Sequence, residues 1–216
     1  WKLWNWRNAF VFEPDFRKPS NPEVIISHCW RSFTCFMYPM ADLVGSRDGA
    51  AAERWWQRSD EGWVKLNTDG AVTVGTSVAG CSGVLRDNLG VWIAGFCKQL
   101  GRCSARTAEE WAIVEGLMLA WNLGFKKIIV NSDATELVGS LANSQSSHDS
   151  LLMSKIRELM SRSWSVSVDY TPRDLNRLAD ALAKWGLFKT CIFSDCPLTL
   201  RGIADRDSLG SFPFIV

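Results

Sequence analysis

Regular alternation of hydrophobic and polar residues is confined to the middle of the chain, between about residues 63 and 186. Residues 63–67 alternate apolar and polar side chains, which predicts a half-buried strand that ends at Asp69. Two further strands and the hairpin turn between them are predicted at residues 78–85, 91–99 and 86–90. The region therefore opens with three consecutive strands.

Helical and strand patterns then alternate. A long helix is predicted at 104–122, and it stops before Gly124, a residue type common just after helix ends. The β-branched run at 127–131 predicts a buried strand. The remaining elements are helices at 136–142, 151–162 and 174–186 and a strand at 165–170. This order, β-β-β-α-β-α-α-β-α, predicts an α/β fold in which helices flank a mixed sheet.

Composition divides the chain into three regions. Residues 1–62 form a Trp-rich N-terminal extension, which begins as a helix with Trp1 and Trp4 at near-helical spacing and continues into a polar, Ala-rich linker. Residues 63–187 form the main domain. Residues 188–216 are punctuated by proline and glycine and are interpreted as a loose C-terminal tail.

The net charge of +1, with 47% hydrophobic and 22% charged residues, is that of an ordinary globular protein. A nucleic-acid-binding domain is usually basic, so any phosphate binding here must come from a local patch or from bound cations. No stretch approaches the roughly 18 apolar residues of a membrane span. The chain begins with Trp1 and not with methionine, which indicates a fragment of a longer protein.

Seven cysteines occur at spacings that fit neither a disulfide framework nor a CxxC pair. We interpret them as free thiols of a reducing compartment, which predicts an intracellular location in the nucleus or the cytoplasm. The two histidines, His28 and His148, are too few to favour structural zinc.

Acidic residues mark the predicted ends of two strands. Asp69 closes the first strand and Asp133 the fourth, and in α/β sheets such strand ends are where ligands bind. Two carboxylates at this edge would repel one another unless a cation lay between them. The alternative is local: Asp69 would serve only a turn, and Asp133 only a helix N-cap.

The helix at 104–122 adds a third acid. Glu109 shares the small apolar side of this helix with Ala112 and Gly116, so its carboxylate points inward, where an unpaired charge is costly. Oxygen ligands alone favour Mg²⁺ or Mn²⁺ over zinc. Glu110 lies on the flank and is expected to complete a capping box with Thr107. Asp180 lies on a polar helix side, and pattern alone favours a solvated position for it.

Five blocks together resemble the plant-type ribonuclease H domains of non-LTR retrotransposons. The blocks are KLNTDGA at 65–71, AGCSGVLRD at 79–87, TAEEWA at 107–112, SD at 132–133 and NRLADALA at 176–183. The opening WKLWNWRN also resembles the stretch upstream of such domains in retroelement polyproteins, where a reverse transcriptase precedes it. Its alternative is an amphipathic helix that packs its tryptophans on the domain or on a lost neighbour.

The resemblance implies a ribonuclease H-like fold with a five-stranded sheet of order 3-2-1-4-5. It implies endonucleolytic hydrolysis of the RNA strand of an RNA/DNA hybrid by two Mg²⁺ ions, for which Mn²⁺ can substitute. It moves Asp180 from the surface to the site, so that Asp69, Glu109, Asp133 and Asp180 become the catalytic, metal-binding acids. Substrate contacts are implied for Gly70, Ala71, Asn176 and Tyr170, with the backbone at Gly70 and Ala71 reading 2′-hydroxyls.

Tyr170 departs from the family pattern, because it stands where these domains usually carry a histidine. A phenol keeps its proton at neutral pH and is a poor proton shuttle, so a slower enzyme is predicted. Phosphate contacts are expected from Lys98, Arg102, Arg106 and Arg173. The alternatives are a weak or inactive domain of retroelement origin that binds nucleic acid or protein, and another nuclease of the same superfold.

Overall fold

The computed structural model describes residues 56–143 and 150–209. The predicted Trp-rich extension and most of its linker fall at residues 1–55, outside the described residues. Among the helices within the described ranges, none combines the length and apolar character needed to cross a membrane.

Six strands form a single mixed sheet of order β5-β4-β1-β2-β3-β6. They are β1 (Val64–Val72), β2 (Val78–Arg86), β3 (Trp92–Arg102), β4 (Lys127–Ser132), β5 (Ser165–Tyr170) and β6 (Cys191–Phe193). The β1–β2, β2–β3 and β3–β6 pairs are antiparallel, whereas β4 runs parallel to β1 and to β5. The predicted order of five strands is confirmed, and β6 extends it by one strand beside β3.

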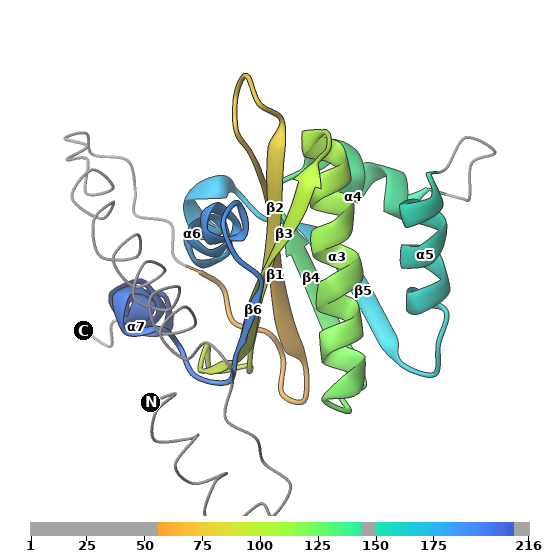
Figure 1. The fold of residues 1–216 in the computed structure, drawn as a ribbon. Coiled ribbons are helices and arrows are strands. Elements are labelled where there is room, and N and C mark those ends of the chain that lie inside the picture. The colour runs from red at the N-terminus through yellow and green to blue at the C-terminus, as the bar shows by residue number, and fades with distance from the viewer. Residues whose placement is uncertain (1–55, 144–149, 210–216) are drawn as a thin grey trace, which may run out of the picture. The chain divides into compact units, whose positions relative to one another are not determined.

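Helices cover both faces of the sheet. Figure 1 shows α6 on one side and α3, α4 and α5 together on the other. Their bounds are α3 (Ala105–Asn122), α4 (Thr135–Ala142), α5 (Leu151–Met160) and α6 (Arg177–Gly186), and α7 (Arg201–Leu209) follows near α6. Two short 3-10 turns, η2 (Arg173–Leu175) and η3 (Leu198–Leu200), precede α6 and α7.

The long helix α3 packs closely on β1. A Cβ atom built on Gly116 would come within 2.7 Å of the Leu66 side chain, so glycine lets the helix approach the strand. The helix ends as predicted near Gly124, which has a φ of +84°. The Gly124 N–H donates to Trp121 O and the Phe125 N–H to Ala120 O, the pattern of a Schellman motif.

Three local predictions were wrong in instructive ways. The first strand does not end at Asp69 but runs to Val72, because pairing with β2 continues after pairing with β4 has stopped. The predicted helix at 174–186 is interrupted at Asn176, which separates η2 from α6. The start of α3 is capped by Ser104, whose Oγ accepts from the Thr107 N–H, and not by a capping box of Thr107 and Glu110.

Part of the predicted loose tail belongs to the folded domain. Residues of β6 pair with β3, and Leu200, fully buried, packs in a cluster with Val84, Leu178 and Leu182 on the α6 side of the sheet. Within the described stretch 188–207, Leu200 is the only buried residue, so no helical or strand period stands out in the sequence there. Packing against β3 and α6 supplies the order that local pattern lacks.

Candidate active site

Asp69 and Asp133 come together where β1 and β4 separate. The parallel pairing of these strands covers Val64 to Asn67 on β1 and ends there, two residues before Asp69. Asp69 continues in pairing with Ser82 of β2, while the chain after β4 turns away at Asp133 towards α4. The gap between the diverging strands leaves both carboxylates at the same edge of the sheet.

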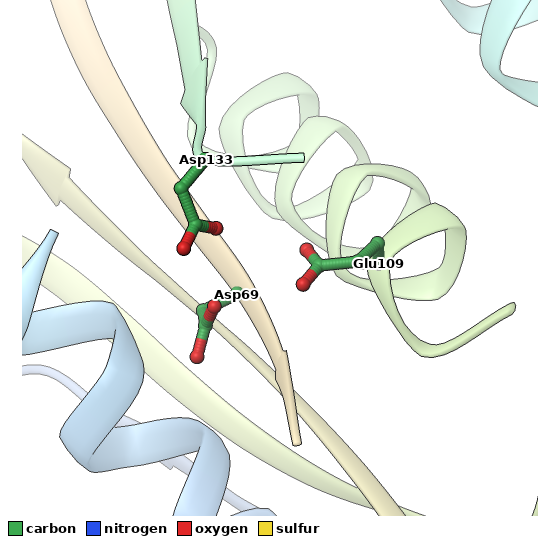
Figure 2. A group of neighbouring side chains, drawn as sticks. All are labelled: Asp69, Glu109 and Asp133. Carbon is green, nitrogen blue, oxygen red and sulfur yellow. The ribbon is translucent and has the colours of Figure 1, made fainter. Parts of the chain in front are cut away.

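Glu109 approaches this edge from the first turns of α3. Gly70, next to Asp69 in the strand, allows the approach: a Cβ atom there would lie 2.8 Å from the Glu109 backbone nitrogen. The Gly70 backbone N–H is also close enough to the Glu109 carboxylate to lower its pKa. Figure 2 shows the side chains of Asp69, Glu109 and Asp133 gathered around a common space.

The three carboxylates form a group able to hold a cation. One carboxylate oxygen from each of Asp69, Glu109 and Asp133 lies within 4.8 Å of the others. Burial raises the pKa of Asp69 to about 9, and the neighbouring charges of Glu109, Asp133 and Asp180 add to the rise. Burial, with the charge of Asp133, raises the pKa of Glu109 to about 7, against the lowering effect of the Gly70 N–H and of Arg173. The protein alone therefore disfavours the ionised forms.

A hard divalent cation fits this environment. Glu109 Oε2 is buried and has no hydrogen-bond partner among the described residues, which is costly for a carboxylate in a protein interior. The donors are carboxylate oxygens alone, the ligand set of Mg²⁺ and Mn²⁺. A bound cation would satisfy the orphaned oxygen and offset the mutual repulsion of the acids.

Asp180 lies beside this group without joining it. Its carboxylate accepts from Arg173 Nη2 at 3.3 Å and from Lys184 Nζ at 2.7 Å. It is nevertheless close enough to raise the pKa of Asp69. The structure thus brings three of the four predicted acids into one cluster and places the fourth at its border, where the side chains of Arg173 and Lys184 bind it.

Asn176 is buried, with only 1% of its surface exposed, and both ends of its side-chain amide are bonded within the protein. Its Nδ2 donates to Thr68 O at 2.8 Å, and its Oδ1 accepts from Asn67 Nδ2 at 3.1 Å. Tyr170 ends β5, pairs with Ser132 and is exposed. The placement of Asn176 favours a role in holding β1 and α6 together over the substrate contact that the resemblance implied.

The four basic side chains expected to contact phosphates differ in whether they already form an ion pair within the protein. Lys98 pairs with Glu115 and lies 5.1 Å from the Trp111 ring, and Arg173 pairs with Asp180. Arg106 pairs with Glu110, which is 2% exposed and also accepts from Ser150 Oγ. Arg102 is exposed and makes no ion pair within the described part of the chain. The sequence pattern placed Glu110 on the flank and did not predict its burial, because its partner Ser150, just before α5, is forty residues away in the sequence.

Residues 67–186, more than half of the chain, match the family model described as reverse transcriptase-like. The chain belongs to the reverse transcriptase-like family. It is also 31% identical over 98% of its length to an Arabidopsis thaliana protein named "Putative ribonuclease H protein", and it spans about a third, 35%, of that relative. The reverse transcriptase-like domain of this chain is therefore an RNase H-like domain of plant type.

Solved structures agree with this assignment. RNase H1 of the archaeon Halobacterium salinarum is 28% identical and superposes with a TM-score of 0.54, over 58% of this chain and 97% of its own. The N-terminal RNase H domain of a Mycobacterium tuberculosis protein, 24% identical, has a TM-score of 0.54 over 58% of this chain and 93% of its own. At 24% identity the second likeness shows the fold alone.

Proposed function

We propose that this domain hydrolyses the RNA strand of RNA/DNA hybrids as an endonuclease, with two Mg²⁺ ions held by Asp69, Glu109, Asp133 and Asp180. Its family supports hybrid cleavage in general. The observation that carries the proposal is the group of three carboxylates within 4.8 Å, one of which keeps a buried oxygen without a hydrogen-bond partner in the part of the chain that the structure describes. Bound divalent cations would supply a water activated for attack on the phosphodiester and a counter-charge for the leaving oxygen.

The residues of the chain have distinct proposed roles. Asp69, the most buried of the acids, would contact the ions together with Glu109 and Asp133, while Asp180 would exchange its bonds to Arg173 and Lys184 for a place at the site. Released from Asp180, Arg173 would be free for a phosphate. The backbone at Gly70 and Ala71, beside Asp69, would read the 2′-hydroxyls of the RNA strand.

Recognition of the hybrid is proposed to depend on its A-form shape and backbone. Of the expected phosphate contacts, Arg102 is the most available, and a net charge of +1 predicts modest affinity that falls with salt. The domain is proposed to act within a longer polypeptide that includes a reverse transcriptase upstream, in the nucleus or the cytoplasm.

One observation favours a second candidate, a domain that binds nucleic acid with little or no catalysis. Tyr170 occupies the position of the histidine that is usual in such domains, and its side chain is 51% exposed at the end of β5. A phenol there is a poor proton carrier at neutral pH.

The test is cleavage of an RNA/DNA hybrid labelled on the RNA strand, in Mg²⁺, by the 216-residue chain. Asp69→Asn and Asp133→Asn should each abolish cleavage, whereas Glu158→Asn, on the exposed face of α5, should leave it unchanged. Products should carry a 5′-phosphate. Absence of cleavage by the parent chain and by Tyr170→His, in Mg²⁺ and in Mn²⁺, would refute the enzymatic proposal and favour the binding domain.

A further inference from the structure

Arg86, at the end of β2, is a charged side chain with only 1% of its surface exposed. The sequence pattern placed it at the start of a hairpin turn, yet it is the last residue of β2. Its guanidinium lies 4.1 Å from the centre of the Trp56 ring and donates from Nη1 to Asp207 Oδ2 at 2.8 Å. A buried cation is strongly unfavourable without such a partner, so this position needs a specific explanation.

The other terminal nitrogen of the Arg86 guanidinium begins a series of hydrogen bonds that reaches the candidate active site. Arg86 Nη2 donates to Asn67 Oδ1 at 2.6 Å, and Trp56 Nε1 donates to the same oxygen at 3.3 Å. With its oxygen occupied by two donors, the Asn67 amide must present its Nδ2 to Asn176 Oδ1, at 3.1 Å. Asn176 in turn must present its Nδ2 to the Thr68 carbonyl, at 2.8 Å.

This series of hydrogen bonds, Arg86 to Asn67 to Asn176 to the Thr68 carbonyl, is here called the polar chain. All of its hydrogen bonds are donated in the same direction, because the first residue, Arg86, can only donate. It ends on the peptide unit that joins Thr68 to Asp69. Asn176 is also the residue that directly precedes α6, which carries Asp180. The polar chain therefore contacts both of the segments that hold these two acids.

Asp207 supplies the counter-charge for this arrangement from the C-terminal helix α7. It lies twenty-one residues beyond Gly186, where the match to the reverse transcriptase-like family ends (207 − 186). The position of α7 follows from Leu200, fully buried at the turn before it, and from the pairing of β6 with β3. The segment after the matched region thus reaches back to neutralise a charge behind the candidate active site.

We propose that Arg86 and Asp207 are positioning residues, through which the C-terminal helix α7 orients Asp69 and the start of α6 for catalysis. This rests on the proposed hybrid cleavage. The two residues touch neither substrate nor cation. They fix the amide orientations of Asn67 and Asn176, and these hold the Thr68–Asp69 backbone at one distance from α6.

The test compares removal of one partner with removal of both, in the full 216-residue chain. Asp207→Leu leaves Arg86 buried without a counter-charge, and its urea midpoint should fall sharply. The double variant Arg86→Leu/Asp207→Leu contains no buried charge at this position, so its midpoint should return towards that of the parent chain. Its Asn67 Oδ1 has lost the shorter hydrogen bond, from Arg86, and keeps only the 3.3 Å bond from Trp56, so the amide is held less firmly. Stability and positioning are thereby separated.

Even if the double variant regains the parental stability, its kcat on the hybrid should be lower by about tenfold or more, with KM little changed. The reason is that misplacing reacting groups by about 1 Å lowers the rate on the order of a hundredfold. The backbone amide resonances of Asp69 and Gly70 should also shift. The double substitution Lys155→Leu/Glu158→Leu, which removes an exposed ion pair on α5, should change none of these readouts. A stable double variant with the parent's kcat and unshifted resonances would overturn the proposal.

Asn67→Asp provides an independent variant if the double variant fails to fold. An aspartate at this position still accepts from Arg86, yet it cannot donate to Asn176 Oδ1, so the polar chain is broken at its second step. The same loss of kcat and the same shifts at Asp69 and Gly70 are expected, and parental values would overturn the proposal. If the parent chain itself does not cleave the hybrid, the proposed function fails, and the amide shifts alone decide the coupling.

Discussion

Gly70 of β1 lies against the backbone of Glu109 in α3, and a Cβ atom built on this glycine would stand 2.8 Å from the Glu109 nitrogen. The close approach sets the distance between strand and helix at the point where three carboxylates meet. The glycine beside Asp69 is therefore a structural requirement of the acid cluster, whatever contacts it makes with a substrate.

Gly70→Ala should destabilise the domain by about 1–3 kcal/mol, because the added methyl group overlaps helix backbone that cannot move as a side chain would. Cleavage should fall as well, since Glu109 is displaced. Urea denaturation and hybrid cleavage measure the two effects. Gly139→Ala is the matched control: nothing lies within 4 Å of its new Cβ, and in the middle of α4 it should stabilise by about 0.5–1 kcal/mol. Equal stabilities for the two variants would contradict this account.

The metal-free protein should lose stability as the pH rises. The pKa of Asp69 is about 9 in the folded protein against an ordinary 3.8, so the folded state holds this proton more tightly than the unfolded chain does. The stabilisation from protonation is complete below about pH 4 and is lost as the pH rises towards about 9. Glu109, at about 7, contributes to the same fall between its ordinary 4.5 and 7.

Thermal melting in EDTA tests this expectation. Asp69→Asn, which cannot ionise, should be more stable than the parent chain at about pH 8, and the two should converge at acidic pH. Adding Mg²⁺ should raise the melting temperature of the parent chain and have little effect on Asp69→Asn. If the melting temperatures of the parent chain and of Asp69→Asn changed with pH in parallel, ionisation of the clustered carboxylates would not destabilise the fold.

Tyr170→His should raise kcat severalfold at neutral pH. Imidazole can accept and release a proton there, which a phenol does poorly, and general acid–base groups commonly contribute about a hundredfold or more. The fold should be unaffected, because the side chain is 51% exposed. Tyr170→Phe keeps the ring and removes the hydroxyl, and it should cleave at the parental rate. A large loss in Tyr170→Phe would instead assign the hydroxyl a direct part in the reaction.

Leu200→Ala should destabilise the domain by about 2–5 kcal/mol, because this fully buried side chain packs on α6 and β2 beyond the family match. The neighbouring Leu198 is 75% exposed, and Leu198→Ala should change stability by no more than about 0.5 kcal/mol. Denaturation by urea distinguishes them. Similar small effects for both leucines would mean that the segment after Gly186 is not part of the cooperative fold.

Much of the architecture could be predicted from the sequence because its signals are local. The alternation around Leu66, the apolar side of α3 and the glycine after that helix are set by neighbours a few residues away. The sheet order of the first five strands, in contrast, was implied by the resemblance to a family. The inward direction of Glu109 follows from helical period alone. Asp180 is different: its helix face is polar, and only the resemblance to a family predicted that it belongs to the site.

Features that depend on distant partners could not be predicted from local pattern. Arg86 has the sequence context of a hairpin turn, and what buries it is Asp207, over a hundred residues away, together with the Trp56 ring. Asn176 interrupts a helical pattern because its amide is used by β1. Hydrophobic period records which side of an element is covered, and that much was determined by the sequence alone. Which buried polar group finds which partner was decided only by the tertiary structure, because a hydrogen bond or ion pair depends on positions that packing alone sets.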